Sequence, residues 1–121
     1  MLPTSLEELR IRSAIFDSDI SHLLMNLPKL KILELGNGFM KEITYIPQSL
    51  EYLILSKNYN QDLNALFLTN YDGNLKYVEV GSSYSHIFDH TILPKGINVK
   101  VDKEKYKELL MEREMSRISF V

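Results

Sequence analysis

Apolar and polar positions alternate in five short stretches of this chain. The clearest is residues 50–55 (LEYLIL), and similar stretches end at Ile11, Leu35, Val80 and Val101, in steps of 24, 20, 25 and 21 residues. Successive side chains of a β-strand point to opposite faces, so this alternation predicts short strands with one buried face. The recurring step predicts repeat units that stack and place their strands side by side in parallel.

The apolar positions predict a shared core beneath the five strands. The residues expected to point inward are Leu9 and Ile11, Leu33 and Leu35, Leu53 and Leu55, Val78 and Val80, and Val99 and Val101. A further inward row precedes them at Leu6, Leu30, Leu50 and Leu75, with Ile97 in the last unit. Each unit is too small to bury its apolar face alone, so we expect neighbouring units to share one continuous core.

An aromatic residue follows each of the first four strands at an equivalent position. These residues are Phe16, Phe39, Tyr59 and Tyr84, and each is followed four residues later by Ile20, Ile43, Leu63 or Phe88. Repetition in register favours a column of stacked rings over unrelated core residues.

The segments that return the chain between strands alternate in length. Residues 17–27 have apolar side chains at helical spacing, which predicts a helix capped by Asp17 or Ser18, and residues 62–69 predict a shorter helix. The returns after Leu35 and Val80 are shorter, and we expect them to be extended or 3₁₀-helical. Residues 103–116 predict a final helix, capped by Asp102, that covers the apolar end of the stack.

Residues 46–63 (IPQSLEYLILSKNYNQDL) resemble the FNIP repeats, a branch of the leucine-rich repeat superfamily. The resemblance implies an α/β solenoid with a parallel concave sheet of about five short strands, a mixed helical and extended convex side and a C-terminal capping helix. It covers residues 1–101, and residues 102–121 form the expected capping helix and tail. Of the four residues that follow the aromatics, only Asn60 matches the family asparagine, and the usual leucine-rich repeat asparagine occurs only at Asn58. The LPxSL element also resembles repeats of bacterial secreted effectors, and the family implies an interaction scaffold.

Composition limits the function classes. The chain has 121 residues, a net charge of −2 and no cysteine. The mixed charges give no basic patch, so we expect no nucleic-acid partner, and the absence of cysteine favours a reducing compartment. The first residues lack a secretory pattern and no apolar run reaches the ~18 residues of a membrane span, so we expect a cytoplasmic protein without a membrane partner. No motif suggests an enzyme or a cofactor.

The outward positions of the strands are the candidate binding site for a protein partner. They are Arg10, Ile32, Glu34, Tyr52, Ile54, Tyr77, Glu79 and Lys100. Alignment of the strands brings Ile32, Tyr52, Ile54 and Tyr77 together as an apolar centre, with Arg10 beside Glu34 and Glu79 beside Lys100 as lateral pairs. An aromatic centre inside a polar rim is typical of protein interfaces. The alternative is that Tyr and Ile simply favour strands.

Three other features suggest partners or ligands. No cap precedes the first strand, so Leu6, Leu9 and Ile11 predict an exposed edge that either pairs with a second copy as a homodimer or continues into a longer repeat array. His86 and His90 have a zinc-like spacing, but their segment is not predicted to be helical, so we expect no metal site. Ser119-Phe120-Val121 matches a carboxyl terminus of the kind that PDZ domains accept, although packing on the last helix is the simpler expectation.

Overall fold

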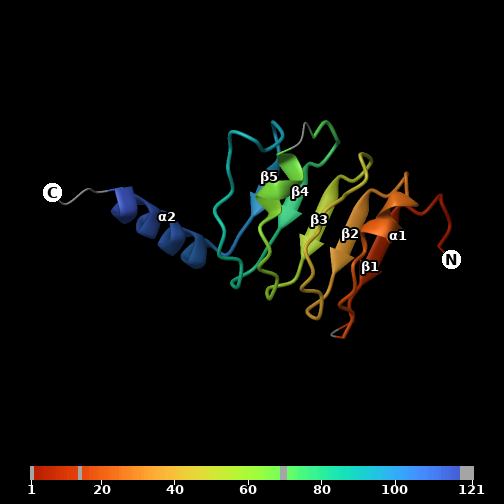
Figure 1. The fold of residues 1–121 in the computed structure, drawn as a ribbon, viewed down its shortest axis with the longest axis horizontal. Helices are drawn as coiled ribbons and strands as arrows, with labels where there is room; N and C mark the ends of the chain where they lie inside the picture. Colours follow the sequence, from red (N-terminus) through yellow and green to blue (C-terminus); the bar gives the residue numbers. More distant parts are fainter. Residues whose placement is uncertain (1, 14, 69–70, 118–121) are drawn as a thin grey trace.

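The computed structural model contains a single parallel sheet and describes residues 2–13, 15–68 and 71–117, with side chains described as far as residue 112. The strands are β1 (Glu8–Ile11), β2 (Ile32–Leu35), β3 (Tyr52–Leu55), β4 (Tyr77–Glu79) and β5 (Asn98–Lys100). They lie side by side in chain order, from β1 at one end to β5 at the other (Figure 1). The five predicted parallel strands are therefore confirmed.

The register between strands matches the alignment of the repeats. Each strand residue pairs with its equivalent in the next unit: Leu9 with Leu33, Leu33 with Leu53, Leu53 with Val78, and Val78 with Val99. Because equivalent residues share a face, the inward and outward rows predicted from period-two alternation are also correct.

The inward rows form one continuous core beneath the sheet. Leu30, Leu33, Leu50 and Leu53 are fully buried, and the same cluster continues through the middle of the stack. At the β1 end, Leu6, Leu9 and Ile11 are only half-buried, and Val99 and Val101 are half-buried at the β5 end. The core is thus closed along its length by neighbouring units and more open at both ends.

Aromatic rings from successive units stack on one another. The centroids of Phe16 and Phe39 are 6.2 Å apart and those of Phe39 and Tyr59 are 5.9 Å apart, with interplanar angles of 16° and 7°. Towards the C-terminal end, Tyr84 stacks on Phe88 with centroids 5.2 Å apart. The predicted column is present from Phe16 to Tyr59, whereas Tyr84, the fourth predicted member, stacks on Phe88 of its own unit.

Two of these aromatic residues, the buried Tyr59 and Tyr84, also satisfy polar backbone groups. The Tyr59 hydroxyl donates to the carbonyl oxygen of Lys41 at 2.9 Å, and the Tyr84 hydroxyl accepts from the backbone N–H of Leu63 at 3.0 Å. A buried hydroxyl without a hydrogen-bond partner would destabilise the fold. Each tyrosine therefore packs its ring in the core and also hydrogen-bonds a backbone group.

The first return helix differs from its prediction. α1 spans only Ser21–Met25, and no side chain caps it, so the prediction of an Asp17 or Ser18 cap is wrong. The carboxylate of Asp17 instead accepts from the backbone N–H of Met40, in the next unit, at 2.8 Å. The Asp17 carboxylate, which the local pattern assigned to the start of the helix, thus bonds to the next unit.

The second return helix agrees with its prediction. η1 (Leu63–Phe67) is a 3₁₀-helix, and the carboxylate of Asp62 accepts from the backbone N–H of Asn64 at 2.9 Å. This short side-chain bond satisfies one of the N–H groups that a helix start leaves unpaired.

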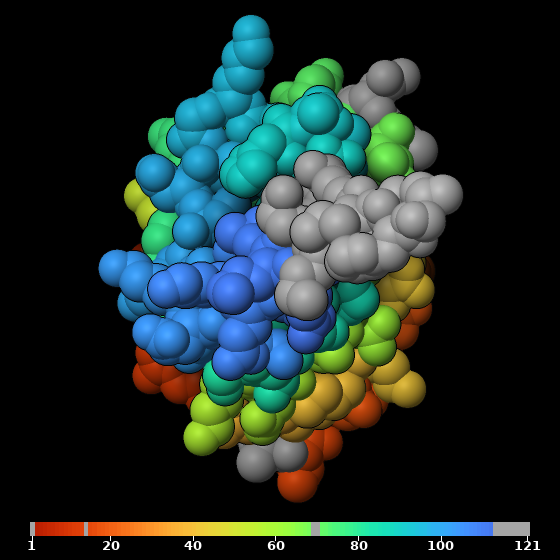
Figure 2. All heavy atoms as spheres, turned by 90° about the vertical axis from the view of Figure 1, so that its left-hand side faces the viewer, coloured from red at the N-terminus to blue at the C-terminus, as the bar shows by residue number. Residues whose placement is uncertain are grey.

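The final helix, α2 (Lys103–Arg117), is present and its predicted cap is confirmed, because Asp102 accepts from the backbone N–H of Lys105 at 3.0 Å. α2 runs outward from the β5 end (Figure 1), and the chain leading to β5 remains visible beside it when that end is viewed directly (Figure 2). Tyr106 stacks on Phe88 with centroids 6.5 Å apart, whereas Leu110 and Met111 are 41% and 58% exposed. The helix therefore contacts the core near its start and projects beyond it.

Candidate functional site

The candidate site is the open face, meaning the face of the sheet that turns away from the core. Its centre is Ile32, Tyr52, Ile54 and Tyr77, and its charged members are Arg10, Glu34, Glu79 and Lys100. Pairing places Tyr52 between Ile32 and Tyr77, and Ile54 between Glu34 and Glu79. The structure thus brings all eight predicted residues onto one face.

Two tyrosines form the middle of the open face. The Tyr52 and Tyr77 rings lie with centroids 5.9 Å apart at an interplanar angle of 48°, and Tyr52 is 40% exposed. The Tyr77 hydroxyl donates to the carboxylate of Glu79 at 2.7 Å. This hydrogen bond, together with desolvation and the nearby charge, raises the pKa of Tyr77 to about 12. Tyr77 is therefore fixed in orientation, and Tyr52 offers an accessible ring beside it.

The first predicted lateral pair is a three-residue cluster. Oε1 of Glu34 lies 2.9 Å from Nη1 of Arg10 and 3.0 Å from Nη2 of Arg12. Hydrogen bonds from the two guanidinium groups hold the pKa of Glu34 below its ordinary value. The predicted site omitted Arg12, although its position two residues after Arg10, on the same face and diagonal to Glu34, was a usable signal.

The second predicted lateral pair is weaker. Nζ of Lys100 lies 4.0 Å from Oε1 of Glu79, at the limit of an ion pair, and both side chains are partly exposed. The same oxygen accepts the shorter bond from Tyr77. Solvent-exposed pairs at this distance contribute little, so the hydroxyl of Tyr77 is the main partner of Glu79.

A hollow adjoins the apolar centre where the strands end. It has a volume of about 420 Å³, and its lining includes Arg12, Glu34, Ile54, Lys57 and Glu79. The position after β2 is Gly36, where an added Cβ would lie 2.8 Å from the backbone carbonyl carbon of Arg12. The absence of a side chain at Gly36 therefore permits the close approach of the segments that follow β1 and β2, beside the hollow. The hollow presents an apolar floor between carboxylates and cations.

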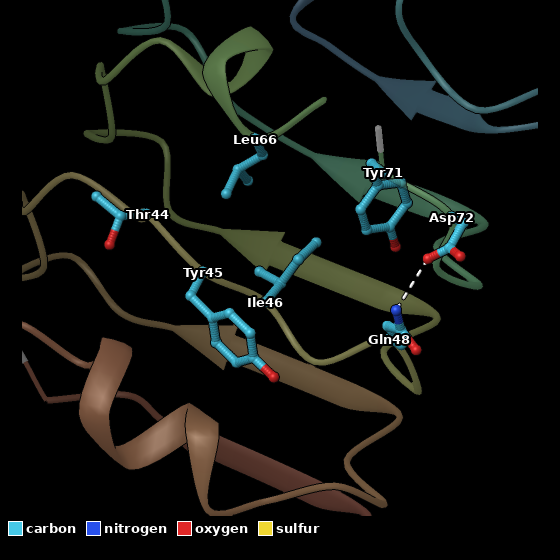
Figure 3. A pocket seen from close by; sticks show the side chains of 7 residues that line it. All are labelled: Thr44, Tyr45, Ile46, Gln48, Leu66, Tyr71 and Asp72. Atoms are coloured by element: carbon cyan, nitrogen blue, oxygen red, sulfur yellow. Dashed lines mark hydrogen bonds between the residues drawn. The ribbon is translucent and has the colours of Figure 1, made fainter. Parts of the chain in front are cut away.

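A second pocket lies on the return side of the sheet. It measures about 210 Å³ and is lined by Thr44, Tyr45, Ile46, Gln48, Leu66, Tyr71 and Asp72 (Figure 3). Its polar groups hold the chain in place: Gln48 donates to Asp72 at 2.9 Å, and the Tyr71 hydroxyl accepts from the backbone N–H of Leu75 at 3.2 Å. Burial raises the pKa of Tyr71. The polar groups of this pocket are therefore explained by their role in holding segments of the chain together.

The histidine pair does not form a metal cluster. Nε2 of His86 lies 3.0 Å from the carbonyl oxygen of Asn60, and His90 is exposed in a turn. Among the described side chains, those of residues 2–13, 15–68 and 71–112, no three from His, Cys, Asp or Glu come close enough to hold a cation together.

The remaining predicted features lie at the two ends. β1 is the edge strand, as expected, with Leu6, Leu9 and Ile11 half-buried beneath it. The motif Ser119-Phe120-Val121 lies outside the described residues. Within the part of the chain that is described, no helix combines the length and apolar character needed to cross a membrane.

No protein-family model, curated protein or solved structure matches this chain.

Proposed function

We propose that this chain is a small leucine-rich solenoid, similar to the FNIP branch, that binds a protein partner in the cytoplasm without catalysing a reaction. The observation that carries the proposal is the open face, where the rings of Tyr52 and Tyr77 lie together among charged side chains. The partner would place apolar side chains over these rings and polar groups over the surrounding charges.

Two features support the repeat architecture. The sheet order follows the chain order, as expected when each unit stacks on the one before it. Equivalent residues also make equivalent contacts between units, since Asp17 accepts from the backbone N–H of Met40 and Asn60 accepts from that of Ser85 at 2.8 and 2.7 Å. The FNIP resemblance itself rests on the sequence motifs.

Side chains on the open face should lose little conformational entropy when a partner binds. Tyr77 is held by its bond to Glu79, and Glu34 is held by two arginines. Side chains already fixed before binding lose little conformational freedom when a partner arrives. Tyrosine and arginine are also the residues in which interfaces concentrate their binding energy.

A paired-variant capture experiment tests this role. Protein carrying both Tyr52→Ala and Tyr77→Ala should lose the partners that the unchanged chain captures from a lysate, as identified by mass spectrometry. The matched control carries Met25→Ala and Leu68→Ala, which remove exposed apolar side chains outside the open face.

Binding of a purified partner then gives the magnitude. Truncation of a central aromatic residue commonly costs 2 kcal/mol or more, so the Tyr52/Tyr77 variant should bind on the order of 30-fold or more weakly. The control pair should bind as the unchanged chain does. Equal affinity of all three proteins, with unchanged melting temperatures, would exclude the open face as the binding surface.

A further inference from the structure

The sheet ends at β1 with backbone groups that β2 does not use. The carbonyl oxygens of Glu7 and Ile11 both accept bonds of 2.7 Å from the chain of β2. In a parallel strand, successive residues direct their backbone groups to opposite neighbours. The backbone N–H and C=O groups of Glu8, Arg10 and Arg12 therefore point to the free edge, where another strand can pair with them.

The core is also open at this edge. Leu9 and Ile11 are half-buried, and Phe16 stacks on Phe39 while remaining partly exposed. A neighbouring pocket of about 220 Å³ is lined by Leu2, Thr4, Leu23, Asn26 and Leu27. A strand added at β1 would cover apolar side chains and satisfy backbone groups at the same time.

We propose that a second copy of this chain occupies the edge, with its β1 antiparallel to the first about a twofold axis at Arg10. This register places Leu9 opposite Ile11 of the second copy on the inner face, and Glu8 opposite Arg12 of the second copy on the open face. Each of these pairs occurs twice by symmetry. The result is one ten-stranded sheet that carries two open faces side by side.

Charge complementarity favours this register. The twofold axis creates two Glu8–Arg12 pairs, and opposite charges directly across an antiparallel pair are stabilising. The two Arg10 side chains meet at the axis, where Nη1 of each already lies 2.9 Å from Glu34 of its own chain. A register centred on Leu9 would instead place Ile11 opposite Glu7, an apolar residue against a charged one.

Head-to-tail stacking fits less well. Joining β5 of one copy to β1 of the next in the repeat register would place Lys100 beside Arg10 and Glu8 beside the uncharged Asn98. This arrangement lacks the two Glu8–Arg12 pairs that offset the Arg10 pair in the twofold register. α2 begins at Lys103, directly after β5, and projects from that end (Figure 1). A head-to-tail contact would also leave free ends and grow into filaments, whereas the twofold contact closes.

Cysteine cross-linking tests the register directly, because the chain contains no cysteine. In the proposed pairing, Arg10 faces Arg10 and Glu8 faces Arg12 as hydrogen-bonded antiparallel pairs, with Cα atoms ~5.5 Å apart and within disulfide reach. Arg10→Cys should form a covalent dimer under mild oxidation. Glu8→Cys and Arg12→Cys should each cross-link poorly alone and efficiently when mixed.

Lys100→Cys is the matched control, because it occupies the same row on the far strand. It should form no covalent dimer alone, and in a mixture with Arg10→Cys it should not be incorporated into the covalent dimer. Preferential cross-linking in that mixture would show head-to-tail stacking and overturn the proposal. Failure of Arg10→Cys to cross-link, together with a monomer at every concentration in sedimentation equilibrium, would also overturn it and would leave the edge to a strand of another protein.

A charge exchange provides a second measurement. Glu8→Arg and Arg12→Glu should each raise the dimer dissociation constant by about tenfold, because each turns two attractive pairs into repulsive ones. The double variant should restore association, with melting temperatures recorded to exclude unfolding. A double variant that stays as weak as the single ones contradicts the register. The dimer does not depend on the open-face binding role, so either proposal can fail while the other stands.

Discussion

At the scale of single residues, Gly81 and Gly96 are required for different reasons. A Cβ added to Gly81 would lie 2.3 Å from Cα of Lys57, whereas Gly96 has open space around it but a φ of +77°. We expect Gly81→Ala to lower the free energy of unfolding by about 1–3 kcal/mol, because the backbone must move apart. Gly96→Ala should cost ~1 kcal/mol from backbone strain alone.

Urea denaturation of the two variants measures these costs. Gly96→Asn is the control, because asparagine accepts positive φ more readily than alanine, so its loss should be smaller. A Gly81→Ala variant as stable as the unchanged protein would show that the strand ends can separate freely.

The buried tyrosine hydroxyls make stability sensitive to high pH. Burial raises the pKa values of Tyr59 and Tyr84 well above their ordinary value of 10.0. The unfolded chain therefore loses these protons first, and it binds fewer protons than the folded chain above about pH 10. The stabilisation is complete below pH 10 and decreases as the pH rises above it.

Unfolding free energies measured between pH 8 and 11.5 test this sign. The unchanged protein should lose stability above pH 10, and Tyr59→Phe with Tyr84→Phe should flatten that decrease. The phenylalanine variant should also be less stable at neutral pH by roughly 1–3 kcal/mol, since the buried N–H of Leu63 loses its acceptor. Parallel pH profiles for the two proteins would assign the alkaline loss to other groups.

At the scale of the elements, side chains join the segment that follows one strand to the segment that follows the next. Oδ1 of Asn60 accepts from the backbone N–H of Ser85 at 2.7 Å and from its hydroxyl at 2.8 Å. Asn60→Ala should lower the free energy of unfolding by about 0.5–1.5 kcal/mol, the usual net value of a hydrogen bond. Asn60→Asp keeps the acceptor oxygen and should retain most of the stability. Chemical denaturation of both variants measures the difference, and equal losses would indicate that the amide nitrogen matters instead.

Much of the sheet was predictable because its pattern repeats locally. The alternation around Leu53 and Leu55 defines the strand, and the equivalent residues of neighbouring units then define register and faces. The positions of Tyr52 and Ile54 on the open face follow from the same alternation. These features depend on residues close in sequence and on one rule applied five times.

Some side-chain hydrogen bonds could not be predicted in the same way. Asp17 has the sequence context of a helix cap, but its carboxylate bonds to Met40 in the next unit. On the open face, Glu79 was assigned to Lys100, but it accepts its shortest bond from Tyr77 in its own strand. Each outcome depends on side-chain rotamers and on which of several donors lies nearest, and hydrophobic periodicity does not specify either.

At the scale of the whole molecule, each strand pairs only with its neighbours in the chain. β3 has a strand on both sides and fully buried Leu53 beneath it, whereas β1 and β5 have one neighbour each and a half-buried core. Local opening requires less buried surface to be exposed at the ends than in the middle. Stability should therefore decrease from β3 towards both ends.

Hydrogen exchange resolves this gradient and the proposed edge contact in one experiment. The amide of Tyr52, bonded to Lys31 at 2.9 Å, should exchange more slowly than the amide of Asn98, bonded to Lys76 at 2.8 Å, because the β5 end opens more often. The amide of Arg10 points to the free edge, so it should exchange rapidly in dilute protein and slowly in concentrated protein. The Asn98 amide is the internal control, since association at β1 leaves it unchanged. Rapid exchange of the Arg10 amide at every concentration would contradict the dimer, and equal protection of Tyr52 and Asn98 would show that all units open together.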